Sequence, residues 1–323
     1  MYSLCKCVVI LILSMLCVQV HAQPVDAWPS QPVNIIAPID AGSGHDVLTR
    51  RLATELAGIW KQPVRVVNLP GASGVIGTQS VINSVPDGHT LGMVSATFTG
   101  TLAAKPQTSF RRENLTGVIK VARQNFIIFA NSSSPFDNIT QMIAYAKSNP
   151  GKLTYASPGV ASYVHLTLEH LGHVLNLNMV HAPYRGIMQA APDVVSGRVP
   201  IMITVSNPSL EGLVAKGDLK VIGSISENAT YQGNSVQSLP DVVPGVEAHG
   251  YYGIVAPQGV SRTIIDKIQK DVAGVVSQPE FRQTMLSMGM PPDASIGKNF
   301  DGWIDLEVAR LKKIIIRAKL QID

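Results

Sequence analysis

Short runs of apolar residues alternate with helical patterns along most of this chain, and this alternation limits the folds open to it. In the pattern at residues 46–60, Leu48, Leu52 and Leu56 fall on one face at a spacing of four. Ten apolar runs occupy residues 33–38, 64–69, 91–96, 118–122, 126–130, 153–157, 179–182, 201–205, 221–225 and 253–256. Further helical patterns lie at residues 139–148, 163–175, 263–276 and 300–318. The sequence therefore predicts an α/β protein with parallel sheets and helices on both faces.

The size and charge of the chain limit the kinds of protein to which it can belong. A length of 323 residues suggests two domains, and 46% hydrophobic against 15% charged residues provides a large core. The formal net charge is +4, but basic residues gather only in pairs such as Arg50–Arg51 and Arg111–Arg112. Without a basic stripe, we expect no nucleic-acid partner.

The first 22 residues have the pattern of a secretory signal peptide. Lys6 precedes an apolar run at residues 8–20, and residues 20–22 (Val-His-Ala) offer small side chains for cleavage after Ala22. The run is shorter than the roughly 20 residues that a membrane-spanning helix needs. All three cysteines lie at or before residue 17. We therefore expect an exported mature chain without disulfides or cysteine-type zinc sites.

Three glycine-bearing loops connect predicted strands to predicted helices. They cover residues 40–46 (DAGSGHD), 70–77 (PGASGVIG) and 157–162 (SPGVAS). Ligands of open α/β sheets bind beyond the carboxyl ends of the strands, and the free N–H groups of a helix start favour an anion. The loops thus predict an anion-binding site. The alternative for the first loop is an ordinary tight turn in which Asp46 caps the helix.

Metal-binding spacing occurs once, on the helical pattern at residues 163–175. His165, Glu169 and His173 stand four residues apart, so that they share one helix face. They form either the edge of a metal site or, in the interpretation that we favour, a solvated face with one capping histidine. We expect no metal and no cofactor.

Enzyme signatures are absent. The chain contains no GxSxG, P-loop or HExxH motif. An exported serine hydrolase that pairs Ser43, Ser73 or Ser162 with His45 or His165 remains an alternative. We expect no catalytic residues.

An opening segment, WPSQPV at 28–33, and seven further motifs in order along the chain carry a family resemblance. The seven are NLPGASGVIG at 68–77, PDGHTL at 86–91, NPGKLTYAS at 149–157, the spaced set Gly159, Ser162 and His165-Leu166, APYRG at 182–186, LPDV at 239–242 and YGIVAP at 252–257. Each motif is weak alone, but together they span essentially the whole mature chain. The sequence resembles the substrate-binding proteins of tripartite tricarboxylate transporters, the Bug family.

The resemblance implies a fold and a function. The fold is that of a type II-like periplasmic binding protein, with two lobes of parallel-rich sheet flanked by helices and a ligand cleft between them. Lobe 1 would comprise residues 23–125 plus 252–323, and lobe 2 residues 126–251. The ligand would be a small carboxylate (a dicarboxylate, tricarboxylate, acidic amino acid or aromatic acid), delivered by a periplasmic monomer to inner-membrane permease subunits of a tripartite transporter. A ligand sensor that signals without transport is the alternative.

The resemblance also implies which residues bind the ligand. They belong to the three glycine loops, to the APYRG motif and to the end of one second-lobe strand: Gly42, Ser43, Gly44, Ser73, Gly74, Gly159, Ser162, His165, Tyr184, Arg185, Gly186 and Thr204.

Two departures from the family pattern bear on the ligand. Asp40 stands where a neutral residue is usual, and Thr204 stands where many members have an acid. Thr204 disfavours an amino-acid ligand, because an ammonium group would lose a partner. Asp40 reverses that expectation if it faces the cleft.

Overall fold

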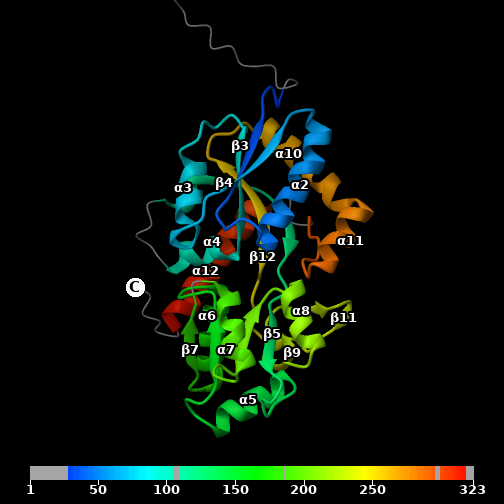
Figure 1. Cartoon of the computed structure of the whole chain (residues 1–323). Helices are drawn as coiled ribbons and strands as arrows, with labels where there is room; N and C mark the ends of the chain where they lie inside the picture. The colour runs from blue at the N-terminus through cyan, green and yellow to red at the C-terminus, as the bar shows by residue number, and fades with distance from the viewer. Residues whose placement is uncertain (1–27, 105–109, 185, 295–298, 318–323) are drawn as a thin grey trace, which may run out of the picture.

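The computed structural model describes residues 28–104, 110–184, 186–294 and 299–317. Figure 1 shows two lobes, one above the other, with the C-terminal helix between them. The described residues form two separate five-stranded sheets and a small two-stranded one. The predicted signal peptide and its cleavage site after Ala22 lie outside the described residues. Within the described ranges, no helix combines the length and apolarity that crossing a bilayer requires.

The first sheet is built from two distant parts of the chain. Its order is β2-β1-β3-β12-β4. The strands are β1 (Val33–Ala37), β2 (Val64–Asn68), β3 (Thr90–Ser95), β4 (Leu115–Arg123) and β12 (Tyr251–Pro257). Strand β1 runs parallel to β2 and β3, whereas β12 is antiparallel to both β3 and β4.

The second sheet comes from one continuous stretch of chain. Its order is β7-β6-β8-β5-β9. The strands are β5 (Ile127–Asn131), β6 (Thr154–Ser157), β7 (Val180–Pro183), β8 (Ile201–Thr204) and β9 (Leu219–Ser224). Strand β6 is parallel to β7 and β8, whereas β5 is antiparallel to β8 and β9. The short pair β10 (Thr230–Tyr231) and β11 (Asn234–Ser235) forms a separate hairpin.

These two sheets confirm the predicted α/β fold class and all ten predicted strands, but the prediction of parallel sheets needs correction. Both sheets are mixed. The cause is the path of the chain, which enters β5 directly from the end of β4 and returns through β12. A strand that arrives from the other sheet runs opposite to its neighbours. Periodicity within a strand carries no information on this direction.

The two crossing segments touch. The Gln124 N–H donates to the Gly250 carbonyl oxygen at 3.0 Å. A Cβ at Gly250 would lie 2.6 Å from the Gln124 Cβ and 2.7 Å from the Phe126 ring, so only glycine fits there without displacement. The connection between the two sheets is therefore a closely packed pair of extended segments rather than two separate linkers.

Helices cover both faces of each sheet. The longer ones are α2 (Gly44–Trp60), α3 (Val75–Ile82), α4 (Ala96–Ala104), α5 (Ile139–Ser148), α6 (Tyr163–Leu175), α8 (Pro208–Ala215), α10 (Arg262–Ser277), α11 (Pro279–Ser287) and α12 (Phe300–Arg317). Short helices are η2 (Ala72–Gly74), η3 (Arg112–Asn114), η4 (Ile187–Ala190), α7 (Ala191–Val195) and α9 (Leu239–Val242). Alternate residues of β12 enter different cores: Tyr252 and Ile254 pack with α2 and α10, whereas Tyr251 and Val255 pack with α4 and α12.

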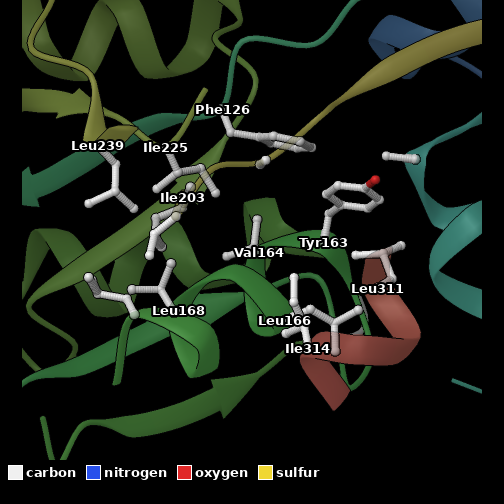
Figure 2. Packing of buried hydrophobic residues seen from close by; sticks show 14 of the residues in the cluster. Phe126, Tyr163, Val164, Leu166, Leu168, Ile203, Ile225, Leu239, Leu311 and Ile314 are labelled. Atoms are coloured by element: carbon white, nitrogen blue, oxygen red, sulfur yellow. The ribbon is translucent and has the colours of Figure 1, made fainter. Parts of the chain in front are cut away.

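One hydrophobic core is shared by the two sheets. It joins Phe98 of α4 and Leu311 of α12 to Val164 and Leu168 of α6 and to Ile203 of β8. In Figure 2, Leu311 and Ile314 of α12 approach α6 from the side opposite β8. Because burial of apolar surface provides most of the driving force for packing, α12 holds the second sheet's layer against the first.

Candidate functional site

A cavity of about 1220 Å³ lies between the two sheets. Its walls follow the carboxyl ends of β1, β2, β3, β6 and β7, and include residues such as Ser43, Ser73, Ser95, Ser162 and Tyr184. This is where open α/β sheets place ligands. The three glycine loops, which are up to about 120 residues apart in sequence, all border this one cavity.

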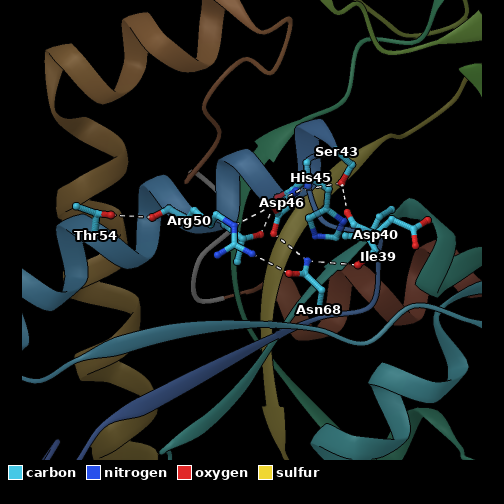
Figure 3. Close-up of polar contacts among 10 residues, drawn as sticks. Ile39, Asp40, Ser43, His45, Asp46, Arg50, Thr54 and Asn68 are labelled. Atoms are coloured by element: carbon cyan, nitrogen blue, oxygen red, sulfur yellow. Dashed lines mark hydrogen bonds and ion pairs between the residues drawn. The ribbon is translucent and has the colours of Figure 1, made fainter.

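The first loop is held by a buried carboxylate at the start of α2. Asp46 Oδ2 accepts the Gly42 N–H at 2.9 Å and Arg50 Nε at 2.9 Å, and Oδ1 accepts Asn68 Nδ2 at 2.8 Å. Burial raises the pKa of Asp46, but these hydrogen bonds outweigh burial and hold the pKa at about 2. Figure 3 shows this network on one side of the loop. The Gly42 N–H is therefore bonded to Asp46 within a tight turn, as the alternative interpretation expects, and Gly42 does not line the cavity.

Ser43 caps α2 and also fixes the loop. Its Oγ accepts the Asp46 N–H at 3.3 Å and donates to the Asp40 carbonyl oxygen at 3.0 Å. The hydroxyl hydrogen is thus already used within the loop. The N-cap is Ser43 rather than the predicted Asp46, because the helix begins at Gly44, three residues before the start that an Asp46 cap would give.

His45 follows on the cavity wall with its ring buried. The residue is 5% exposed and its ring packs against that of Tyr252, tilted by 46°, at a centroid distance of 4.9 Å. Burial lowers the pKa of His45 to about 4, although a hydrogen bond with the Met93 backbone and the charge of Asp46 oppose this. The ring is therefore neutral at pH 7.

The second loop has an unusual backbone. Ala72 and Ser73 have φ of 47° and 56°, in the left-handed region that L-residues rarely adopt. Gly71 and Gly74 beside them also have positive φ. This path turns the chain sharply from β2 into α3 and brings Ser73 and Gly74 to the cavity wall. The Ser73 carbonyl oxygen accepts a hydrogen bond from Thr101 Oγ1 at 3.3 Å, which ties the loop to α4.

The third loop enters α6 over a pair of histidines. Ser162 caps the helix by accepting the His165 N–H at 3.3 Å, and Ala161 has φ of 62°. The Ala161 N–H donates to His165 Nδ1 at 3.1 Å, so that this nitrogen carries no proton. His165 stacks on His181 at 3.9 Å between ring centroids. Burial lowers the pKa of both histidines, which keeps the pair neutral and the loop in place.

The structure brings together most of the residues predicted for the site. Those that line the cavity are Ser43, Ser73, Gly74, Gly159, Ser162, Tyr184 and Gly186. Gly42, Gly44, His165 and Thr204 do not: Gly44 faces Met290, His165 supports the third loop from behind, and Thr204 pairs with Ile127 at the end of β8. Arg185 lies outside the described residues.

The face of α6 that carries His165, Glu169 and His173 is mostly packed against other residues, and not the solvated face that we favoured. His165 is 7% exposed and packed, Glu169 accepts the Tyr155 hydroxyl at 2.7 Å, and only His173 faces solvent. Edge strand β7 places His181 over this face, which the spacing within the helix cannot reveal. Among the described residues, no group of three or more His, Cys, Asp or Glu is arranged to hold a metal ion.

The serine hydrolase alternative finds no support in the geometry. Within the described parts of the chain, the hydroxyls of Ser43 and Ser162 bond to backbone groups rather than to a histidine ring. Among the described residues, Ser157 does contact an imidazole, at 2.6 Å from His181 Nε2, but it is fully buried. A nucleophile needs both a base and access to substrate.

Sequence reasoning missed the contribution of α4. Ser95, Thr97, Phe98 and Thr101 line the cavity, because α4 begins directly after β3. No glycine or turn residue marks this entry, so the sequence gives no loop signal. Gln189 from η4 was also missed. The start of α4 thereby joins those of α2, α3 and α6 around one cavity.

Residues 48–320 match the family described as tripartite tricarboxylate transporter family receptor. The chain belongs to this family. A curated relative in Cupriavidus necator, the UPF0065 protein in the gbd 5' region, is 30% identical over 83% of this chain and 81% of its own length. Protein BugT of Bordetella pertussis is 27% identical and covers 90% of both chains.

Solved structures support the fold of this family member. The R. palustris protein Rpa4515, in a structure with adipate, superposes with a TM-score of 0.79 over 90% of this chain and 98% of its own, at 22% identity. The periplasmic binding protein BugD superposes with a TM-score of 0.77 over 91% of this chain and 99% of its own, at 23% identity. At such identities the likeness concerns the fold.

Proposed function

We propose that this receptor binds a small carboxylate in the cavity between its two sheets and delivers it to a membrane permease. One observation carries the proposal: residues in the first turns of α2, α3 and α4, together with Ser162, which caps α6, all border that cavity. The first N–H groups of a helix have no acceptor within the helix, and the helix dipole places partial positive charge there. An anion held among four such starts gains from all of them.

The cavity wall suits a carboxylate in its side chains as well. Hydroxyl groups of Ser95, Thr97 and Ser162 lie on it, and each can donate to a carboxylate oxygen. Hydrogen bonds to a charged acceptor are stronger than neutral ones. The structural neighbour Rpa4515 was solved with adipate, a dicarboxylate, which agrees with this choice of ligand class.

The path of the chain supports a ligand clamp with two lobes. We propose lobe 1 as residues 23–125 plus 252–323 and lobe 2 as residues 126–251, joined by the paired segments at Gln124 and Gly250. The loops of β1, β2 and β3 would hold the ligand from one side and those of β6 and β7 from the other. Membership of a transporter receptor family supports a periplasmic location, a cleaved leader and capture for permease subunits.

A thermal-shift screen tests the proposal. Purified protein is heated with a library of mono-, di- and tricarboxylates, amino acids and neutral sugars at fixed pH and ionic strength. A ligand at 100 times its Kd stabilises the folded form by about 2.7 kcal/mol, which raises Tm by several degrees. The methyl ester of each hit is the control. The proposal is wrong if esters stabilise as well as free acids, or if only sugars do.

A further inference from the structure

One carboxylate on the cavity wall has no role in the fold. Asp40 lines the cavity, is exposed, and its side chain forms no hydrogen bond or ion pair with any residue that the structure describes. In Figure 3 its carboxylate points away from the network around Asp46. The backbone beside it is fixed, because the Asp40 carbonyl oxygen accepts the Ser43 hydroxyl at 3.0 Å. The negatively charged side chain of Asp40 therefore borders the cavity, and the backbone that carries it is fixed by Ser43.

No described residue balances this charge. The lining residues of the cavity within the described ranges include no lysine or arginine. Arg50, the nearest cation in the first loop's network, is engaged by Asp46 and by Asn68 Oδ1 at 2.8 Å. His45 is neutral at pH 7, because burial lowers its pKa to about 4. A dicarboxylate brought into the cavity would meet a third negative charge.

A second acceptor lies on the same wall. His45 Nε2 is buried and has no hydrogen-bond partner among the described residues. The hydrogen bond to the Met93 backbone favours the protonated ring, which means that the ring donates there. A neutral imidazole has one N–H, so Nε2 is left as an acceptor. A buried acceptor without a donor is costly, and a donor from a ligand or water satisfies it.

We propose that Asp40 is a specificity-determining residue that binds an ammonium group, so that the ligand is an amino-substituted carboxylic acid. This rests on the proposed function: the helix starts hold the carboxylate, and the wall formed by Asp40 and His45 takes the cationic donor. The ligand is then a zwitterion or carries a single net negative charge. Such a ligand complements both the partial positive charge of the helix ends and the full negative charge of Asp40.

Matched ligand pairs test this inference. Each pair differs by one amine: aspartate and succinate, glutamate and glutarate, 4-aminobutyrate and butyrate. Calorimetry measures the Kd of each for the wild-type protein, Asp40→Asn and the control Asp266→Asn, which changes an exposed aspartate on α10. In the wild type and the control, we expect the amine member of at least one pair to bind about 10–100-fold more tightly. In Asp40→Asn that preference falls to within about threefold, while the affinity for the amine-free partner stays equal or rises.

The outcomes separate the two proposals. If carboxylates bind but the amine confers no preference, or Asp40→Asn leaves the preference unchanged, Asp40 does not select an ammonium and the carboxylate receptor stands without this inference. If no member of any pair and no other carboxylate binds, the proposed function itself is overturned. Circular dichroism of Asp40→Asn is expected to match the wild type, because the side chain has no described partner to lose.

Discussion

Glu307 of α12 is the centre of a buried ionic network where α12 meets α6. Its carboxylate is 3% exposed and accepts Arg310 Nη2 at 2.7 Å and His249 Nδ1 at 2.9 Å. It also accepts a hydrogen bond from the hydroxyl of Tyr163, a buried residue in the first turn of α6. Burial raises the pKa of Glu307, but the hydrogen bonds from His249 and Arg310 lower it to about 2. The group is therefore ionised throughout the range in which proteins are usually handled.

Glu307→Gln keeps the shape of this side chain and removes its charge. Removal of one member of a buried ion pair costs about 3–5 kcal/mol, because the partner charge is left uncompensated. The Arg310 side chain is 25% exposed, so water recovers part of its solvation. We therefore expect the lower limit, a loss of about 3 kcal/mol in the free energy of unfolding.

Urea denaturation followed by circular dichroism measures the effect. With a slope of about 3 kcal/mol per molar, expected for a chain of this size, the midpoint falls by about 1 M. Glu280→Gln, on the exposed start of α11, is the matched control and shifts the midpoint little. A midpoint for Glu307→Gln equal to that of the control would refute the view that this network fastens α12 to α6.

Two further results are expected. Between about pH 6.5 and pH 4 the unfolded chain binds a proton at His45 that the folded chain does not, so the free energy of unfolding decreases as the pH is lowered, by roughly 3 kcal/mol at 1.36 kcal/mol per pKa unit. Urea titrations at several pH values measure this decrease. We expect His45→Gln to make it smaller, and an unchanged decrease in the variant contradicts the prediction. Ser162→Ala weakens carboxylate binding about 10–150-fold in calorimetry, because the hydroxyl donates to the anion. Ser43→Ala is the control, because it removes the same kind of helix cap, whereas its hydroxyl hydrogen is already bonded to the Asp40 carbonyl oxygen. Equal losses of affinity in the two variants would show that only the helix caps affect binding.

Much of the fold could be predicted because its strands are short apolar runs bounded by turns. Helix α4 was missed since its sequence, ATFTGTLAA, consists of small and apolar residues without a polar face. The burial of nearly all its residues explains this composition. Strand direction was also beyond reach, because β5 and β12 owe it to the crossing of the chain between sheets.

The site was predictable where glycine marks a loop and unpredictable where partners are distant in sequence. Ser73 and Ser162 were found from their loops, and both line the cavity. Gly42 was assigned to the ligand by the family resemblance, whereas its N–H bonds to Asp46 within the same turn. The partner of His165 is more distant in sequence, since His181 stacks on it from β7.

The placement of β12 has a consequence for how the chain acquires its structure. This strand lies between β3 and β4, yet it is made more than 120 residues after them. Until residues 251–257 emerge, β3 has one open edge and β4 has no sheet partner, whereas the second sheet can close from its own contiguous segment. Edges left open in this way favour pairing with other chains, and pairings between distant residues form slowly. A chain that emerges from its N-terminus therefore has every strand of its second sheet available before its first sheet can be completed, and β3 and β4 are exposed to pairing with other chains during that interval.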